Sequence, residues 1–197
     1  MTNDPDLGAL IASRLCHDLI SPLSAIGNGV ELLAMTAPPG PELTLISDSV
    51  ESALARIRFF RLAYGAASSS HIVGRNEIVS LLDALSRSGR LQFAWEVAED
   101  LTRERVKLAL LLCACVEAAL PYGGTITVDG QADRLAVRGR GPRLRIDAEV
   151  WDLLRHLDVT AETRPANAQF AVAAALLRHH ARPIRIETGE HGIDIAL

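Results

Sequence analysis

Apolar residues recur at alternating three- and four-residue steps near the start of the chain. This spacing is the a/d pattern of a supercoiled helical bundle, so it predicts one long helix from Asp4 to Ala34. Asp4 and Pro5 supply an N-cap and a proline for the first turn, and Pro22 predicts a local kink. The apolar seam of this helix consists of Ala12, Cys16, Leu19, Leu23, Ile26, Val30 and Leu33.

The same spacing returns after a proline-rich break at residues 36–41. Consecutive prolines remove backbone donors, so this break predicts a tight turn and a second helix that starts at Pro41. A short connection between two such helices predicts an antiparallel hairpin. Two helices leave part of the seam in water, so we expect a homodimer whose two hairpins form a four-helix bundle. The second seam consists of Leu43, Ile46, Val50, Ala53, Ile57, Phe60 and Tyr64.

The pattern changes after the small-residue segment 66–70, and strands then alternate with helices. We therefore expect an α+β fold with two domains, residues 1–68 and residues 69–197, the second with helices on one face of a mostly antiparallel sheet. Thr102 is the expected cap of an apolar helix, and Asp129-Gly130 is placed in a turn. Strands are predicted at 91–97, 125–128, 134–138, 183–187 and 192–197, and helices at 76–86, 102–120, 147–155 and 167–181.

Composition excludes several classes of function. The chain has 20 Lys+Arg and 24 Asp+Glu, a formal charge of −4, so it lacks the basic excess of a nucleic-acid-binding protein. The longest apolar run, 108–116, is far shorter than the ~20 residues that span a bilayer, so we expect no membrane segment and a cytoplasmic protein. Cys16, Cys113 and Cys115 lack zinc-site spacing and are expected to be buried thiols.

The candidate chemistry lies on the first predicted helix. At about 100° per residue, His17 lies about 160° from Leu19 of the apolar seam and therefore faces solvent. An exposed neutral imidazole is a nucleophile near pH 7, and the neighbouring carboxylate of Asp18 can orient or deprotonate it. Periodicity alone leaves open an ordinary surface histidine. The polar residues that share its face are Arg14, Ser21, Ser24 and Asn28.

The segment His17-Asp18-Leu19-Ile20-Ser21-Pro22-Leu23 resembles the H-box of histidine kinases. In that motif a His is followed by an acid, by a small hydroxyl or amide residue four positions later, and then by Pro. The motif belongs to a helical hairpin for dimerisation and phosphotransfer, which agrees with the heptad spacing. Residues 71–197 likewise resemble the order of elements in the Bergerat-type ATPase domain of these kinases.

The nucleotide-binding motifs of that domain are degenerate in this sequence. The N-box helix offers Cys113 and Glu117 in place of the family's asparagines, and magnesium requires oxygen ligands. Val137 stands where the family's aspartate recognises adenine, and it has no acceptor for the adenine amine. The lid aligns with residues 166–170, which contain no glycine. We therefore expect no ATP binding, no cofactor and no metal ion of the protein's own.

Two short motifs in the second domain have ordinary interpretations. Gly139-x-Gly141 is interpreted as a turn after a strand, because short glycine motifs are unspecific. His179 and His180 diverge by ~100° on a helix, so they do not chelate one ion and are expected on the helix surface.

A phosphotransfer hairpin joined to a degenerate kinase-like domain resembles the ChpT-type histidine phosphotransferases over essentially the whole chain. The resemblance implies a phosphotransferase that is not ATP-dependent. The resemblance further implies that the protein passes a phosphoryl group from a receiver-domain aspartate, typically on a hybrid histidine kinase, through His17 to a response regulator. In the family such phosphorelays serve cell-cycle or developmental regulators.

The resemblance also implies roles for the residues on the predicted helix. His17 is the expected phospho-acceptor through Nε2, with Asp18 as polariser or proton acceptor, and magnesium comes with the receiver. On helical geometry, the expected receiver contacts are Arg14, Ser21, Ser24 and Asn28. Two alternatives remain, an autophosphorylating histidine kinase and a non-enzymatic receiver-binding scaffold.

Overall fold

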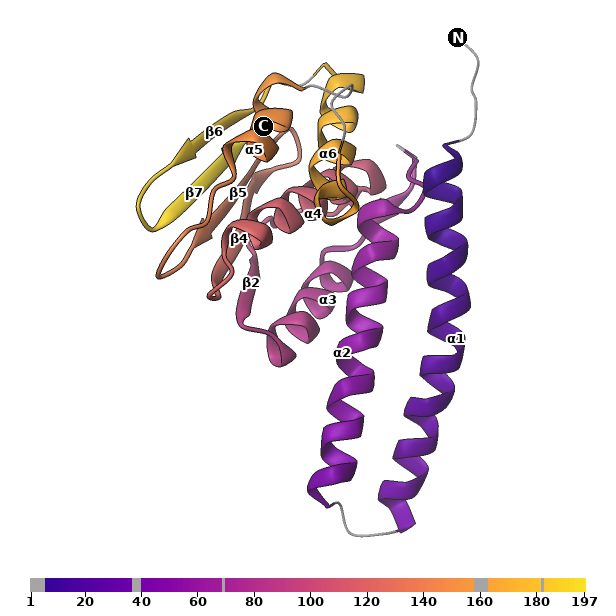
Figure 1. The fold of residues 1–197 in the computed structure, drawn as a ribbon. Helices are drawn as coiled ribbons and strands as arrows, with labels where there is room; N and C mark the ends of the chain where they lie inside the picture. Colours follow the sequence, from indigo (N-terminus) through magenta and orange to yellow (C-terminus); the bar gives the residue numbers. More distant parts are fainter. Residues whose placement is uncertain (1–5, 37–39, 69, 158–162, 182) are drawn as a thin grey trace.

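The first two helices form an antiparallel hairpin that stands beside the rest of the protein (Figure 1). The computed structural model describes residues 6–36, 40–68, 70–157, 163–181 and 183–197. Helix α1 spans Leu7–Thr36 and helix α2 spans Pro41–Tyr64, as the heptad pattern predicts. The predicted domain boundary between residues 68 and 69 falls in the segment that joins α2 to the next strand.

The ends of the hairpin helices differ in part from the sequence prediction. The expected cap at Asp4-Pro5 and most of the proline-rich turn lie outside the described residues. Asp6 caps α1, since its Oδ1 accepts a hydrogen bond from the backbone N–H of Ala9 at 3.0 Å. Pro22 lies inside α1, and the predicted kink does not interrupt the helix.

Helix α1 is also long and apolar enough, by length and composition alone, to cross a membrane. Only 6% of its most apolar 18-residue window is buried. The same helix carries Arg14, Asp18 and Glu31, and it pairs along its length with α2. Its apolar residues therefore face both α2 and solvent.

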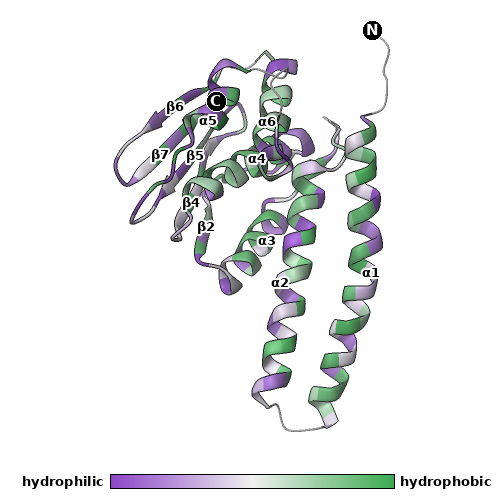
Figure 2. Ribbon diagram, viewed as in Figure 1, coloured by the Kyte–Doolittle hydropathy of each residue, from purple (hydrophilic) through white to green (hydrophobic). Residues whose placement is uncertain are grey.

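The remaining chain forms a five-stranded sheet with helices on one face, which confirms the predicted α+β class (Figures 1 and 2). The sheet order is β2-β4-β5-β7-β6, and only the β2–β4 pair is parallel. Its strands are β2 (Leu91–Trp95), β4 (Gly124–Gln131), β5 (Arg134–Arg140), β6 (Arg185–Thr188) and β7 (Gly192–Ala196). The other elements are β1 (Ile72–Val73), α3 (Arg75–Ser88), β3 (Leu101–Thr102), α4 (Arg103–Ala119), α5 (Ala148–His156), a 3₁₀ turn (Pro165–Asn167) and α6 (Ala168–His179).

Two predictions about the sheet are wrong. Asp129 and Gly130 lie within β4, where they pair with Ala136 and Leu135, because the ladder extends three residues beyond the predicted strand. Gly139 belongs to β5 and not to a turn. A β-carbon on Gly139 would collide with a methyl of Val116 on α4, so this glycine allows the helix to lie directly on the sheet.

Helix α4 is the centre of the core. Its predicted cap is confirmed, because the Thr102 side chain accepts a hydrogen bond from the backbone N–H of Arg105. The described side chains of the run 108–113 are at most 2% exposed. Both faces of α4 are covered, by the sheet on one side and by α2 and α6 on the other. This explains an apolar run without amphipathic periodicity.

Two cations from the first turns of α4 anchor the C-terminal end of α2. The Arg103 guanidinium donates to the carbonyl oxygens of Leu62 at 2.5 Å and Arg61 at 2.7 Å. The Lys107 ammonium donates to the carbonyl oxygen of Gly65 at 3.0 Å. Arg103 and Lys107 are each 6% exposed, and burial lowers the pKa of both groups. They satisfy backbone carbonyls that a helix end otherwise leaves without partners.

A second contact between α2 and α4 is an ion pair. The two terminal nitrogens of Arg56, Nη1 and Nη2, donate to Oε2 and Oε1 of Glu117, each at 3.0 Å. A bidentate pair of this kind fixes orientation as well as distance. The hairpin is therefore joined to the C-terminal part by directional contacts at the end and in the middle of α2.

Candidate functional site

His17 lies on the surface of α1, where the sequence predicts it. Its side chain is 78% exposed, and those of Arg14 and Asp18 are 76% and 47% exposed. Residue 16 on the same helix is buried against α2. The imidazole is therefore accessible to a macromolecule that approaches from solvent.

The three charged or titratable side chains of this face are connected. The Nε of Arg14 donates to Oδ2 of Asp18 at 2.9 Å, and Oδ1 of Asp18 lies 3.4 Å from Nδ1 of His17. An ionised carboxylate only accepts hydrogen bonds, so this contact requires the proton on Nδ1. The lone pair of the neutral ring is then on Nε2.

The environment keeps Asp18 ionised. The hydrogen bond with His17 and the hydrogen bond and charge of Arg14 together lower the pKa of the Asp18 carboxyl below its ordinary value. A lowered pKa means that the contact is present at neutral pH and is lost only as the pH falls through that lowered value. Asp18 can therefore orient the ring throughout the neutral range.

The other predicted contact residues lie along the same side of α1, with one difference in burial. Ser21 and Asn28 are exposed, whereas Ser24 is half-buried. Pro22 has no backbone N–H, so the carbonyl of Asp18 lacks its partner within the helix. This carbonyl lies within a turn of the imidazole.

Sequence periodicity does not identify the exposed apolar residues at the N-terminal end of α1. Leu10 lies about 20° from His17 in helical projection, two turns earlier, at about 100° per residue. It is 47% exposed, and the neighbouring Leu7 is 66% exposed. Neither belongs to the heptad seam that guided the prediction, so only their exposure in the structure identifies them. They extend the surface around His17 with apolar area.

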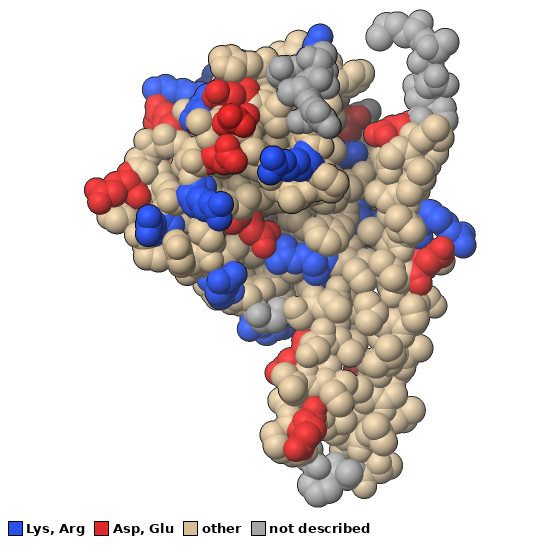
Figure 3. Space-filling view, viewed as in Figure 1, with Lys and Arg blue, Asp and Glu red and all other residues tan. Residues whose placement is uncertain are grey.

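The hairpin has two distinct sides. Cys16 faces α2, so His17 lies about 100° to one side of it and Leu15 about 100° to the other, at about 100° per residue. On the side of Leu15 an exposed apolar surface continues over both helices, and we call it the apolar stripe. Its members are Leu15, Leu19, Ile26 and Leu33 of α1 and Ile46 and Phe60 of α2, which are 40–58% exposed. Figure 3 shows that most of the hairpin surface on this side is uncharged, with acidic side chains near its lower end.

The residues aligned with the nucleotide-binding motifs of kinases do not fit a magnesium–nucleotide complex. The Cys113 side chain is completely buried, and burial raises the pKa of its thiol. Val137 is also completely buried and offers no hydrogen-bond acceptor. Glu117 directs both carboxylate oxygens to Arg56. These positions therefore serve the core and the contact with the hairpin.

His179 and His180 lie at the end of α6, where their rings meet edge to face at 5.0 Å. Within the described parts of the chain, no group of three or more His, Cys, Asp or Glu side chains is arranged for a metal ion.

Comparison with known proteins agrees with this geometry. Residues 75–192 match the family described as histidine phosphotransferase C-terminal domain. Protein phosphotransferase ChpT of Brucella abortus (strain 2308) is 34% identical over 154 residues, which cover 75% of this chain and 74% of that protein. A solved structure described as a bacterial phosphotransferase covers 100% of this chain and 97% of its own, with 27% identity and a TM-score of 0.67.

Proposed function

The chain belongs to the histidine phosphotransferase family, and we propose that His17 is the residue through which it relays a phosphoryl group between receiver domains. The observation that carries this proposal is the exposed imidazole whose Nδ1 faces an ionised carboxylate. Asp18 holds the ring in the tautomer that presents Nε2 to solvent. The family resemblance supports a hybrid-kinase receiver as donor, a response regulator of the cell cycle as acceptor, and a cytoplasmic location.

Both transfer steps can proceed without a cofactor bound to this chain. The Nε2 lone pair forms a bond to phosphorus as the bond between phosphorus and the receiver's aspartyl oxygen breaks, and its electrons return to that carboxylate. The phosphorylated ring then carries its positive charge next to Asp18, whose carboxylate stabilises the Nδ1 proton. The second transfer reverses these steps toward the acceptor aspartate. Magnesium belongs to the receiver's acidic pocket in this scheme.

Phosphate incorporation from a prephosphorylated receiver tests the proposal. The purified protein is mixed with a panel of ³²P-labelled receiver domains, and a parallel reaction contains labelled ATP with magnesium and no receiver. We expect acid-labile label on the protein from at least one receiver and none from ATP. Label from ATP alone would instead establish an autophosphorylating kinase. Absence of label from every receiver would favour a scaffold.

We also infer that the protein is a homodimer formed through the apolar stripe. Six large apolar side chains that are about half-exposed on one side of a hairpin are an unusual surface for a monomer. A second hairpin packed against this side would complete a four-helix bundle and leave both copies of His17 on the outside.

Replacing Ile26 with glutamate is expected to convert the dimer to a monomer. Ile26 lies in the middle of the apolar stripe, and two copies of the new carboxylate would be buried without partners in the bundle. Leu32→Glu is the matched control, because Leu32 is 64% exposed and lies outside the apolar stripe. Light scattering after size exclusion measures the mass. An unchanged dimer with Ile26→Glu would place the interface elsewhere.

A further inference from the structure

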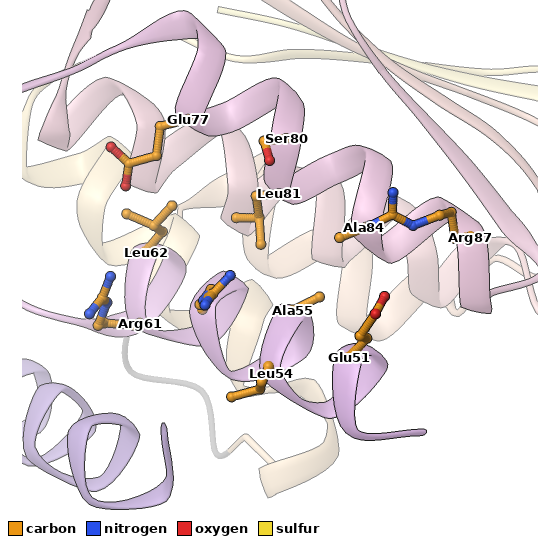
Figure 4. Close-up of a pocket in the computed structure, with 11 residues that line it drawn as sticks. Glu51, Leu54, Ala55, Arg61, Leu62, Glu77, Ser80, Leu81, Ala84 and Arg87 are labelled. Carbon is orange, nitrogen blue, oxygen red and sulfur yellow. The ribbon is translucent and has the colours of Figure 1, made fainter. Parts of the chain in front are cut away.

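A groove of about 560 Å³ runs between α2 and α3 and has no role in the transfer described above. Figure 4 shows it as a channel between the two parallel-lying helices, with side chains of both pointing into it. Its floor is apolar and its rim carries three arginines. The floor includes Leu54, Leu62 and Leu81, and the arginines of the rim are Arg58, Arg61 and Arg87.

This groove opens on the same side of the hairpin as His17. Val50 of α2 lies beside Gly27 of α1 and marks the line where the helices face each other. At about 100° per residue, counted in the direction of increasing residue number, Arg58 lies about 80° from Val50 around α2. His17 lies about 100° from Cys16 around α1, counted in the same sense. In two antiparallel helices that face each other, this sense leads to the same side of the pair. The members of the apolar stripe lie on the opposite side.

The groove also lies at the height of His17. Ser13 accepts a hydrogen bond from the backbone N–H of Ala66 at 3.1 Å, and Gly27 lies beside Val50. These two contacts align residue 17 of α1 with about residue 61 of α2, since the helices rise equally per residue. The charge of Arg61 accordingly reaches the thiol of Cys16. A domain seated on His17 would therefore meet the groove beside it.

The shape of the groove is set in advance. Arg103 and Lys107 hold the C-terminal end of α2 from α4, and the Arg56–Glu117 pair holds its middle. These contacts fix α2 relative to the C-terminal part, which includes α3. A preformed groove binds a partner without the cost of ordering.

The rim of the groove is positively charged, and no described acidic residue forms an ion pair with its arginines. None of Arg58, Arg61 and Arg87 forms an ion pair within 4.0 Å with a described residue. Glu51 and Glu77 also line the groove, at opposite ends of it (Figure 4). The three arginines and two glutamates leave a net positive charge over an apolar floor. An amphipathic helix with an acidic side chain is complementary to this surface.

We propose that the groove between α2 and α3 docks an amphipathic helix of the receiver domain, with an acidic side chain of that helix paired to Arg58. This inference rests on the proposed function, since it assigns the groove to the same receiver that reacts with His17. The apolar side chains of the helix would cover Leu54 and the small exposed parts of Leu62 and Leu81, which are 6% and 7% exposed. Arg61 and Arg87 would flank the central pair from the two helices that form the groove.

Charge reversal at Arg58 and at Arg87 tests the proposal. Transfer from the receiver that labels the wild-type protein fastest is followed over a range of receiver concentrations. Arg58→Glu and Arg87→Glu are each expected to raise the half-saturating concentration at least tenfold, with less than a twofold change in the rate at saturation. Arg134→Glu, at the exposed first residue of β5, is the matched control and is expected to leave both parameters unchanged.

Two further measurements separate docking from chemistry and folding. Labelling of His17 by phosphoramidate needs no docking and should be equal in all variants, and circular dichroism should show unchanged folding. A single Asp or Glu to Lys substitution on the receiver helix should restore tight docking to Arg58→Glu. Wild-type affinity in both groove variants would overturn the groove proposal and leave the relay intact. Failure of every receiver to label the wild-type protein would instead refute the proposed function.

Discussion

Replacing His17 with alanine is expected to reduce phosphoryl transfer from a receiver domain below detection. The imidazole is the exposed nucleophile of α1, and neither Ser21 nor Asp18 can form the acid-labile phosphoramidate bond. Because the side chain is 78% exposed, its removal should change the free energy of unfolding by no more than about 0.5 kcal/mol. Label transfer, chemical denaturation and light scattering on the same samples measure these three quantities.

Variants of the neighbouring residues provide the controls. Asp18→Asn keeps the nucleophile and loses only the ionised partner of Nδ1, so transfer should slow by about 10²-fold without disappearing. Ser21→Ala should retain transfer. A His17→Ala protein that still accepts label would move the phosphorylation site to another residue. A variant that loses label and still carries out its cellular role would favour the scaffold.

Replacing Arg103 with methionine is expected to lower the free energy of unfolding by about 2–4 kcal/mol. The guanidinium is 6% exposed and donates to the carbonyl oxygens of Leu62 and Arg61 at the end of α2. Methionine fills much of the space and leaves the buried carbonyl of Leu62 and the partly buried carbonyl of Arg61 without that donor. It also removes a positive charge from the negative end of the helix dipole.

Urea denaturation at a fixed protein concentration measures this loss, because the stability of the proposed dimer would depend on concentration. Arg178→Met, at an exposed position of α6, is the matched control and should change the value by no more than about 0.5 kcal/mol. Arg103→Lys should fall between the two, since an ammonium keeps the charge but not the two-pronged geometry. Equal stability of Arg103→Met and the wild type would show that burial of this cation costs as much as its hydrogen bonds return.

Local signals in the sequence were sufficient for most elements of the fold. The heptad spacing predicted both hairpin helices, because an apolar residue about every 3.5 positions is a property of each helix alone. The start of α4 was predictable from Thr102, because an N-cap side chain bonds the backbone N–H of a residue only three positions later. The strands β1 and β3 escaped prediction, because two-residue strands have no periodicity and depend on their pairing.

In the candidate site, too, the features that depend on one helix were predictable from the sequence and those that depend on neighbouring elements were not. Helical geometry placed His17 on the outside and gathered Arg14, Ser21 and Asn28 on its side, all within one helix. The contact of Arg14 with Asp18 is likewise a local spacing of four residues. The half-buried state of Ser24 was not visible from α1 alone, because it depends on the neighbouring structure.

The sequence by itself therefore determined the hairpin, the exposed nucleophile and the degenerate nucleotide motifs of this protein. Only the tertiary structure decided what replaced those motifs. Glu117 pairs with Arg56, which lies 61 residues earlier in the chain, and Arg103 closes the end of α2 from a distance of 41 residues. The groove between α2 and α3 depends on both contacts. Such pairs obey no sequence period, because they arise from how separate elements pack and from the need to satisfy buried charges and carbonyls.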